Sequence, residues 1–283
     1  MGVIYLVRHG QADPSAYGLG AEPEGGAPVG SLTDTGVMQA KLSGALLSSL
    51  VSKVDAAFTG TLPRQRQTLA AVLEQFPGAP AAVVESGWDE YEIPDLTGEA
   101  TMDDFRDGAA YQKIIDARLG DWIAGTLALP EGSTHESYAA YRERIRGAAR
   151  TAAAEAGSGK TVLVASSAGT ITALIAELWQ VPDARWPVLA RTMVNASVTK
   201  LISGRSGLSG GSVNEHPPPA DIQTLLAFIS APKPEDLTDG EWEERVNGVL
   251  NLLRRQTEDF ETEDRRKEGA SRQTQDFKTQ DAR

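Results

Sequence analysis

Short apolar runs alternate with longer amphipathic segments along most of this chain. Residues 3–7 are apolar and largely β-branched or aromatic, which is typical of a strand buried on both faces of a parallel sheet. Further strands are predicted at residues 55–59, 83–84, 161–165, 197–202 and 222–229. Helices are predicted from residue 32 and over 62–76, 137–156 and 169–178, with a helical excursion over 100–128. This alternation calls for βαβ units, so we expect a three-layer αβα sandwich around a mostly parallel central sheet.

The domain organisation follows from changes in composition. We expect one α/β domain over residues 1–230. Residues 11–31 are rich in Gly, Pro, Ala and acid, which predicts a long loop, and the Gly/Ser/Pro-rich stretch 203–221 predicts a mobile one. Apolar residues at helical spacing predict an amphipathic helix within 231–256. The balanced charge and few large apolar side chains of 257–283 predict a disordered tail.

The charge balance narrows the expected partners. The 283 residues include 27 Lys and Arg against 39 Asp and Glu, which gives a formal net charge of −12. Such a surface repels phosphate backbones and anionic headgroups, so we expect neither a nucleic acid nor a membrane as partner. No apolar stretch approaches the roughly 20 residues of a membrane span, and the first apolar run is too short for a signal peptide. We therefore expect a cytoplasmic protein, and the sequence does not set its oligomeric state.

The residue types limit the possible chemistry. The chain has no cysteine, which excludes disulfides, Cys-ligated zinc, iron–sulfur clusters and a thiol nucleophile. The three histidines, His9, His135 and His216, lie on separate segments without the spacing of a metal site. Residues 159–161 look like the end of a phosphate-binding P-loop, but they connect a predicted helix to a strand, and the glycines at 18 and 20 lack the third of a dinucleotide fingerprint. We therefore expect no metal and no cofactor.

The strongest chemical signal is the triplet Arg8-His9-Gly10 at the carboxyl end of the first predicted strand. Ligands of open α/β sheets bind outside such strand ends. Glycine lets the backbone approach a ligand, arginine offers a planar fork to phosphate oxygens, and a neutral imidazole is a nucleophile for phosphorus. The alternative is that His9 is a satisfied polar residue at a strand end, and the triplet alone does not decide between the two.

Further elements follow this triplet in a fixed order. They are Leu-Thr-x-x-Gly-x-x-Gln-Ala at 32–40, an arginine before Gln-Thr at 64–68, an acidic loop at 88–91, Glu-Ser at 136–137 and Asn-x-Ser at 195–197. As an ordered series over roughly residues 3–230, they resemble the histidine phosphatase superfamily, also called phosphoglycerate mutase-like. The resemblance implies the α/β fold that the hydrophobic pattern predicts.

The resemblance also implies a role for each site residue. His9 would be the nucleophile that becomes phosphohistidine, and Glu90 would donate the proton to the leaving group. Arg8 and Arg64 would hold the phosphoryl oxygens, and Gly10 would belong to the same phosphate-binding site. These roles fit the chemistry, because phosphoryl transfer spreads charge over three equatorial oxygens that cationic donors stabilise.

Two of these roles have alternatives close by in the sequence. Arg66 is a second candidate for the position of Arg64, although the spacing to the following Gln-Thr favours Arg64. Glu90 stands in a loop with Asp89 and Glu92, and a solvated loop acid is the alternative interpretation there.

One position departs from the family pattern. The second family histidine belongs in a turn after the late strand, where this chain has Ser167. Replacing a cationic donor by a neutral hydroxyl costs roughly 2 to 4 kcal/mol of transition-state stabilisation. We therefore weigh two functions: a phosphomonoester hydrolase or phosphotransferase that acts on a small phosphorylated metabolite through His9, with Ser167 in its phosphate site, and a catalytically impaired phosphate-binding or regulatory protein on the same fold.

Overall fold

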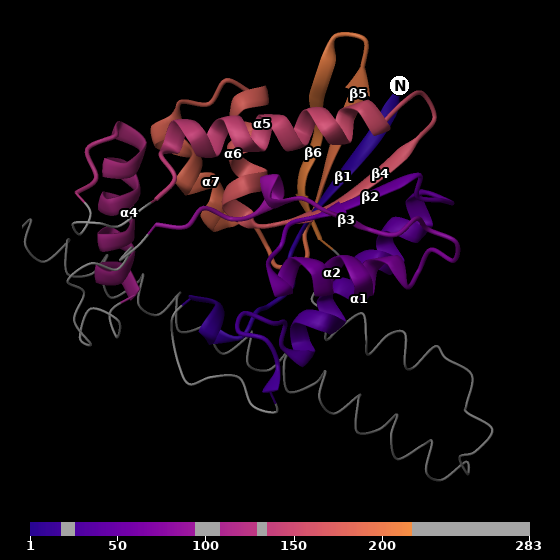
Figure 1. Cartoon of the computed structure of the whole chain (residues 1–283), viewed down its shortest axis with the longest axis horizontal. Coiled ribbons are helices and arrows are strands. Elements are labelled where there is room, and N and C mark those ends of the chain that lie inside the picture. The colour runs from indigo at the N-terminus through magenta and orange to yellow at the C-terminus, as the bar shows by residue number, and fades with distance from the viewer. Residues whose placement is uncertain (18–25, 94–107, 129–134, 217–283) are drawn as a thin grey trace, which may run out of the picture. The chain divides into compact units, whose positions relative to one another are not determined.

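The computed structural model describes residues 1–17, 26–93, 108–128 and 135–216. Within them, six strands form one sheet in the order β3-β2-β4-β1-β5-β6 (Figure 1). The strands are β1 (Gly2–Arg8), β2 (Ala56–Thr59), β3 (Val83–Val84), β4 (Thr161–Ser166), β5 (Val198–Gly204) and β6 (Gly207–Glu215). The first four pair in parallel, whereas β5 and β6 run antiparallel at one edge, so the sheet is mostly parallel as predicted.

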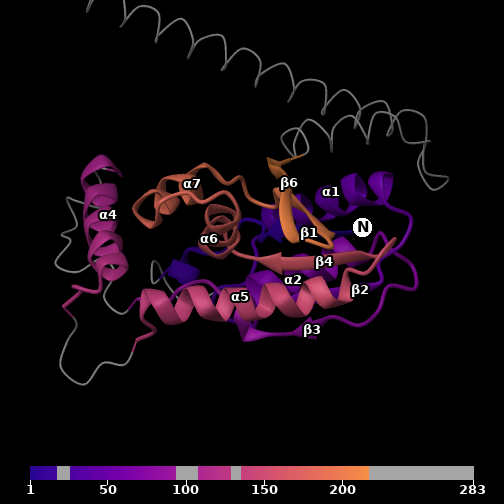
Figure 2. The same ribbon diagram turned by 90° about the horizontal axis from the view of Figure 1, so that it is seen from above.

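Helices cover both faces of this sheet. They are α1 (Asp34–Leu50), α2 (Pro63–Leu73), α4 (Gly108–Ala124), α5 (Tyr138–Glu155), α6 (Ala168–Leu178) and α7 (Trp186–Thr192). Figures 1 and 2 show α1 and α2 together and α5 and α6 together, and the core residues place the two pairs on opposite faces. The arrangement is the three-layer αβα sandwich that the sequence predicts.

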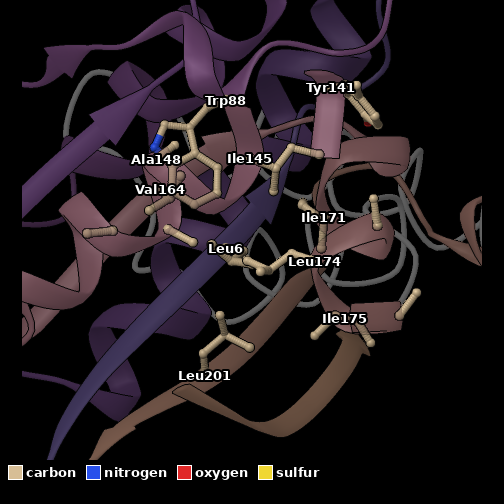
Figure 3. Packing of buried hydrophobic residues seen from close by; sticks show 14 of the residues in the cluster. Leu6, Trp88, Tyr141, Ile145, Ala148, Val164, Ile171, Leu174, Ile175 and Leu201 are labelled. Atoms are coloured by element: carbon tan, nitrogen blue, oxygen red, sulfur yellow. The ribbon is translucent and has the colours of Figure 1, made fainter. Parts of the chain in front are cut away.

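Strand β1 contributes side chains to the hydrophobic core on both faces of the sheet. Ile4 and Leu6 pack with residues of α5 and α6 in one hydrophobic cluster. Figure 3 shows Leu6 within this cluster. Tyr5 and Val7 pack on the opposite face with residues of α1 and α2. All four side chains are buried, as the unbroken apolar run predicts. The carboxyl end of β1 therefore emerges between two helical layers.

The prediction of a mobile loop at 203–221 was wrong for residues 207–215, and residues 217–221 lie outside the described part of the chain. Residues Gly207–Glu215 form β6, which pairs antiparallel with β5 from Val198↔Glu215 to Gly204↔Gly207. Small residues have low strand propensity, but pairing with a neighbouring strand overrides composition. At Gly210 a Cβ would lie 2.5 Å from Nε1 of Trp179, so a larger residue there would require the Trp179 ring to shift.

The remaining differences concern one helix that was not predicted and several predicted segments that lie outside the described residues. The short helix α7 was not predicted, although its first residue, Trp186, is fully buried. The helical excursion at 100–128 is confirmed for α4 alone, because 94–107 are not described. The strand predicted at 222–229, the helix within 231–256 and the tail at 257–283 all lie outside the described residues.

The segment predicted as a long loop, 11–31, begins and ends at one point on the fold. Ala12 and Leu32 form an isolated antiparallel bridge. Next to it, the backbone N–H of Thr33 donates to the carbonyl oxygen of Gln11 across 3.0 Å. We call this paired entrance and exit the neck of the 11–31 segment.

Candidate active site

The predicted site residues gather at the carboxyl ends of β1 and β4. Arg8 stands opposite Ser166 in the β1–β4 register, and the backbone N–H of His9 donates to the carbonyl oxygen of Ser166 across 2.9 Å. His9 and Ser167 are thus the next residues of two adjacent parallel strands, and equivalent positions on such strands face the same side. Both residues are buried. The sheet topology alone therefore brings His9, the candidate nucleophile, beside Ser167, the residue that departs from the family pattern.

The ring of His9 is oriented by its neighbours. Its Nδ1 lies 2.7 Å from the carbonyl oxygen of Gly10. Because a carbonyl only accepts, we assign the ring proton to Nδ1 and the lone pair to Nε2. Arg64 donates its Nε–H to that Nε2 across 3.2 Å. The site therefore presents an imidazole whose nucleophilic nitrogen faces a guanidinium.

The surroundings of His9 disfavour its protonated form. Burial lowers the pKa of His9 from 6.5 to about 3, and the positive charges of Arg64 and Arg8 act in the same direction. The hydrogen bond to Gly10 opposes the change without reversing it. His9 is consequently neutral near pH 7, which is the form that a nitrogen nucleophile requires.

The three arginine candidates are placed differently. Arg64 is buried in the first turn of α2 and contacts His9, whereas Arg66 is exposed on the same helix. Arg8 is partly buried at the end of β1 and donates from Nη1 to the carbonyl oxygen of Met193. The structure therefore brings Arg64, rather than Arg66, to His9.

Gly10, expected in the phosphate site, packs against α1. A Cβ on Gly10 would lie 2.2 Å from the carbonyl oxygen of Gly36, and a Cβ on Gly36 would lie 2.0 Å from that of Gln11. The N–H of Gly10 donates to Oγ1 of Thr68 across 3.0 Å. The structure thus explains both glycines by the close approach of two backbones, and the Gly10 N–H is already engaged within the fold.

Glu90 lies at the N-terminus of α6. Its Oε2 accepts the backbone N–H of Gly169 across 2.9 Å, and its Oε1 lies 3.3 Å from the hydroxyl of Tyr141. Gly169 is two residues beyond Ser167. Glu90 is therefore held beside the β4–α6 turn that carries Ser167.

The neighbouring acids have different surroundings. Asp89 accepts the backbone N–H of Thr61 across 2.5 Å and its hydroxyl across 2.7 Å, so it orders the approach to α2. Glu92 is exposed. The three acids of the loop thus have different contacts, and Glu90 is the one whose side chain contacts the turn after β4.

Ser167 has a partner that the sequence analysis missed. Its Oγ accepts a hydrogen bond from Nε2 of Gln65 across 2.9 Å, and both side chains are fully buried. Gln65 directly follows Arg64 on α2. The available signal was helical spacing, because Gln65 shares the buried face of α2 with Thr68 and Leu69.

A cavity of about 420 Å³ lies beside this cluster. It is lined by Ser86, Asp89, Glu90, Glu92, His135, Glu136 and Arg144. Arg144 is paired there with Glu136 across 2.9 Å. Four acidic side chains make this cavity unsuited to a phosphate group, and neither His9 nor the two arginines beside it line it.

The other two histidines, His135 and His216, are exposed, in contrast to His9. Within the described ranges, no group of three or more His, Cys, Asp or Glu side chains is arranged to hold a metal ion. The helices of that part of the chain are also too short or too polar to cross a membrane.

Comparison with known families gives a match over residues 4–215 to the histidine phosphatase superfamily (branch 1). The chain belongs to this superfamily. A known relative is the 2,3-bisphosphoglycerate-dependent phosphoglycerate mutase of Methylorubrum populi. It is 28% identical over 177 residues, which cover 61% of this chain and 77% of that protein.

Solved structures share the fold. Mycobacterial hydrolase 1 matches with a TM-score of 0.57 and 23% identity, covering 76% of this chain and 99% of that one. A mycobacterial glucosyl-3-phosphoglycerate phosphatase in complex with VO3 matches with a TM-score of 0.55 and 24% identity, covering 76% of this chain and all of that one (100%). The sandwich described above is thus a phosphoglycerate mutase-like α/β fold.

Proposed function

We propose that this protein is a phosphomonoester hydrolase or phosphotransferase that acts on a small phosphorylated metabolite through a phosphohistidine at His9. The observation that carries the proposal is the state of His9. Its Nδ1–H is held by the Gly10 carbonyl, its Nε2 lone pair faces Arg64, and its pKa is lowered to about 3. Membership of a superfamily that contains phosphatases and mutases supports the same chemistry.

In the first step, the Nε2 lone pair of His9 attacks phosphorus and the bond from phosphorus to the ester oxygen breaks. Arg64 exchanges its hydrogen bond to Nε2 for one to a phosphoryl oxygen, and Arg8 adds a second positive charge. Glu90 gives a proton to the departing alkoxide. The step leaves a free alcohol, an Nε2–P bond and an ionised Glu90, while Nδ1–H stays on the Gly10 carbonyl.

In the second step, water attacks phosphorus and the Nε2–P bond breaks. Glu90 removes a proton from the attacking water, which restores the acid for the next turnover. Inorganic phosphate leaves, and His9 regains its lone pair. When the hydroxyl of a second substrate takes the place of water, the same residues carry out phosphoryl transfer instead of hydrolysis.

A second candidate function is phosphate binding without turnover. Two observations favour it: the donor at the end of β4 is the neutral Ser167, and Oε2 of Glu90 is engaged by the backbone N–H of Gly169. Arg8, His9 and Arg64 would then serve for recognition alone.

The experiment compares the wild type with His9→Ala on p-nitrophenyl phosphate between pH 4 and pH 9. The proposal predicts turnover by the wild type, loss of turnover in His9→Ala, and an acid-labile, base-stable phosphoryl adduct on the peptide that contains His9. His216→Ala is the matched control, because it removes an exposed histidine. Unchanged activity in His9→Ala without any adduct would overturn the mechanism. Vanadate binding without an adduct or turnover would favour the binding role.

A further inference from the structure

Ser167 occupies the N-cap position of α6 without capping the helix. A serine at this position normally accepts the N–H of the second or third helical residue. In this structure the Ser167 side chain makes no such bond, and Glu90 accepts the N–H of Gly169, the second residue of α6. Helix capping therefore does not account for the Ser167 hydroxyl, which is turned toward Gln65 instead.

The Gln65 amide has a defined orientation. Its Nε2 lies 3.0 Å from the carbonyl oxygen of Trp88 and 2.9 Å from Oγ of Ser167. The reversed amide would place an oxygen against the Trp88 carbonyl, which only accepts, so the NH2 group must stand there. Both of its hydrogens are then used, one for Trp88 and one for Ser167.

This arrangement determines what the Ser167 hydroxyl can do. Because Gln65 donates to Ser167, the Ser167 oxygen is the acceptor of that bond, and its own proton must point elsewhere. Among the described residues, no acceptor for this proton is found. The position beside Ser167 on the neighbouring strand is His9, where the phosphoryl group would be transferred.

Stability alone does not explain why a glutamine is buried here. Gln65 is fully buried, and its Oε1 has no hydrogen-bond partner within the described part of the chain. An unpaired buried acceptor destabilises a fold. The chain also keeps a glycine at position 60 beside the amide, since a Cβ on Gly60 would lie 1.9 Å from that Oε1.

We propose that Gln65 is a positioning residue that turns the Ser167 hydroxyl into a donor for the transferred phosphoryl group. The inference rests on the function proposed above, because it needs a phosphoryl group at His9. Two consecutive residues of α2 then act at the ends of two neighbouring strands: Arg64 contacts His9 after β1, and Gln65 orients Ser167 after β4. Gln65 and Ser167 together supply a neutral hydrogen-bond donor, held in place by the fold, to a phosphoryl oxygen whose negative charge grows in the transition state.

The test is a double-mutant cycle on p-nitrophenyl phosphate with Gln65→Met, Ser167→Ala and the double variant. Methionine keeps the length of glutamine and cannot donate. We expect each single variant to lower kcat by roughly 10- to 100-fold, and the double variant to be no slower than the slower single one. Affinity for vanadate, measured by calorimetry, should fall by a similar factor, and it reports on the site without turnover.

Melting temperature separates positioning from structural support. Gln65→Met removes an unpaired buried oxygen together with its two donors, so its melting temperature should stay within a few degrees of the wild type. Ser166→Ala is the matched control, because its Oγ donates to the same Trp88 carbonyl across 2.6 Å. That variant should keep the wild-type kcat and vanadate affinity.

Two results would overturn the role of Gln65. They are an unchanged kcat in Gln65→Met, whatever its melting temperature, and multiplying effects in the double variant. His9→Ala tells this failure from that of the proposed function. If His9→Ala abolishes turnover and Gln65→Met does not affect it, only the role of Gln65 fails. If His9→Ala turns over like the wild type, the proposed function itself fails.

Discussion

Arg64 donates its Nε–H to Nε2 of His9 across 3.2 Å, so the Arg64 guanidinium occupies the lone pair of that nitrogen. A phosphoryl group that enters the site offers Arg64 a charged acceptor in place of a neutral one, and charge-assisted hydrogen bonds are the stronger kind. Under the proposed function, binding of the phosphoryl group would therefore free the Nε2 lone pair of His9 when a phosphorus atom is present.

The lowered pKa of His9 predicts how stability depends on pH. Between pH 6.5 and about 3, the unfolded chain binds a proton at His9 that the folded protein does not, so His9 costs stability as pH falls through this window. Above the window both states are neutral and the contribution vanishes. Urea unfolding should show the wild type losing roughly 3 kcal/mol more than His9→Gln between pH 6.5 and pH 4. Equal losses in the two proteins would show that His9 is protonated in the folded state.

The acid role of Glu90 predicts a dependence on the leaving group. Glu90→Gln keeps an oxygen that can accept the Gly169 N–H, but it has no proton to give. We expect kcat/KM, which reports the first step without the shared hydrolysis of the phosphohistidine, to fall about 100-fold or more on an alkyl phosphate and less than about 10-fold on p-nitrophenyl phosphate, whose leaving group needs no proton. Glu92→Gln, on an exposed acid of the same loop, is the control. Equal losses on both esters would contradict the assignment.

The Gln65–Ser167 contact predicts that a histidine at position 167 needs a second change. Ser167 is fully buried against the Gln65 amide, so Ser167→His should overpack and lower the melting temperature. Gln65→Ala/Ser167→His vacates the amide volume, and we expect its kcat on a small phosphate ester to exceed that of the wild type by about 10-fold. Steady-state kinetics with melting curves test this. A double variant that folds like the wild type yet is slower would show that the site uses a neutral donor by necessity.

The contact between Gly36 and Gln11 predicts that adding a methyl group at position 36 lowers the free energy of unfolding. In Gly36→Ala the Cβ would meet the Gln11 carbonyl at 2.0 Å, so unfolding free energy should fall by roughly 1–3 kcal/mol. Gly120→Ala is the matched control, because Gly120 is also helical and has open space around it. The control should gain about 0.5–1 kcal/mol. Urea unfolding of both variants decides, and equal changes would mean that the backbones separate easily.

The fold was predictable because its signals are local. A strand buried on both faces appears as an unbroken apolar run, and the alternation of such runs with amphipathic segments determines the layers. Strand β6 escaped prediction because its glycines and serines carry no apolar pattern. Its pairing with β5 depends on a neighbour that composition does not reveal.

The site was predictable only in part, for a related reason. His9, Arg8 and Arg64 stand in motifs whose order along the chain can be recognised. The partnership of Gln65 with Ser167 joins residues 102 positions apart, and each looks ordinary where it stands. Gly10 was expected in the phosphate-binding site, and the structure shows a further reason for a glycine there that the sequence does not reveal, the close approach of Gly36 in α1.

The neck formed by Ala12 and Leu32 fixes both ends of the intervening segment on the sandwich. The chain leaves and rejoins the sandwich at paired backbone, and Gln11, next to the neck, is fixed to α1 through the side chain of Gln39. A segment of different length or composition grafted between these anchor points would begin and end where the present one does. A Cβ on Gly30 would lie 3.5 Å from Nη1 of Arg64, so the segment between the anchor points borders the candidate site, and a change in its composition would alter the surroundings of Arg64 while its two ends stay in place.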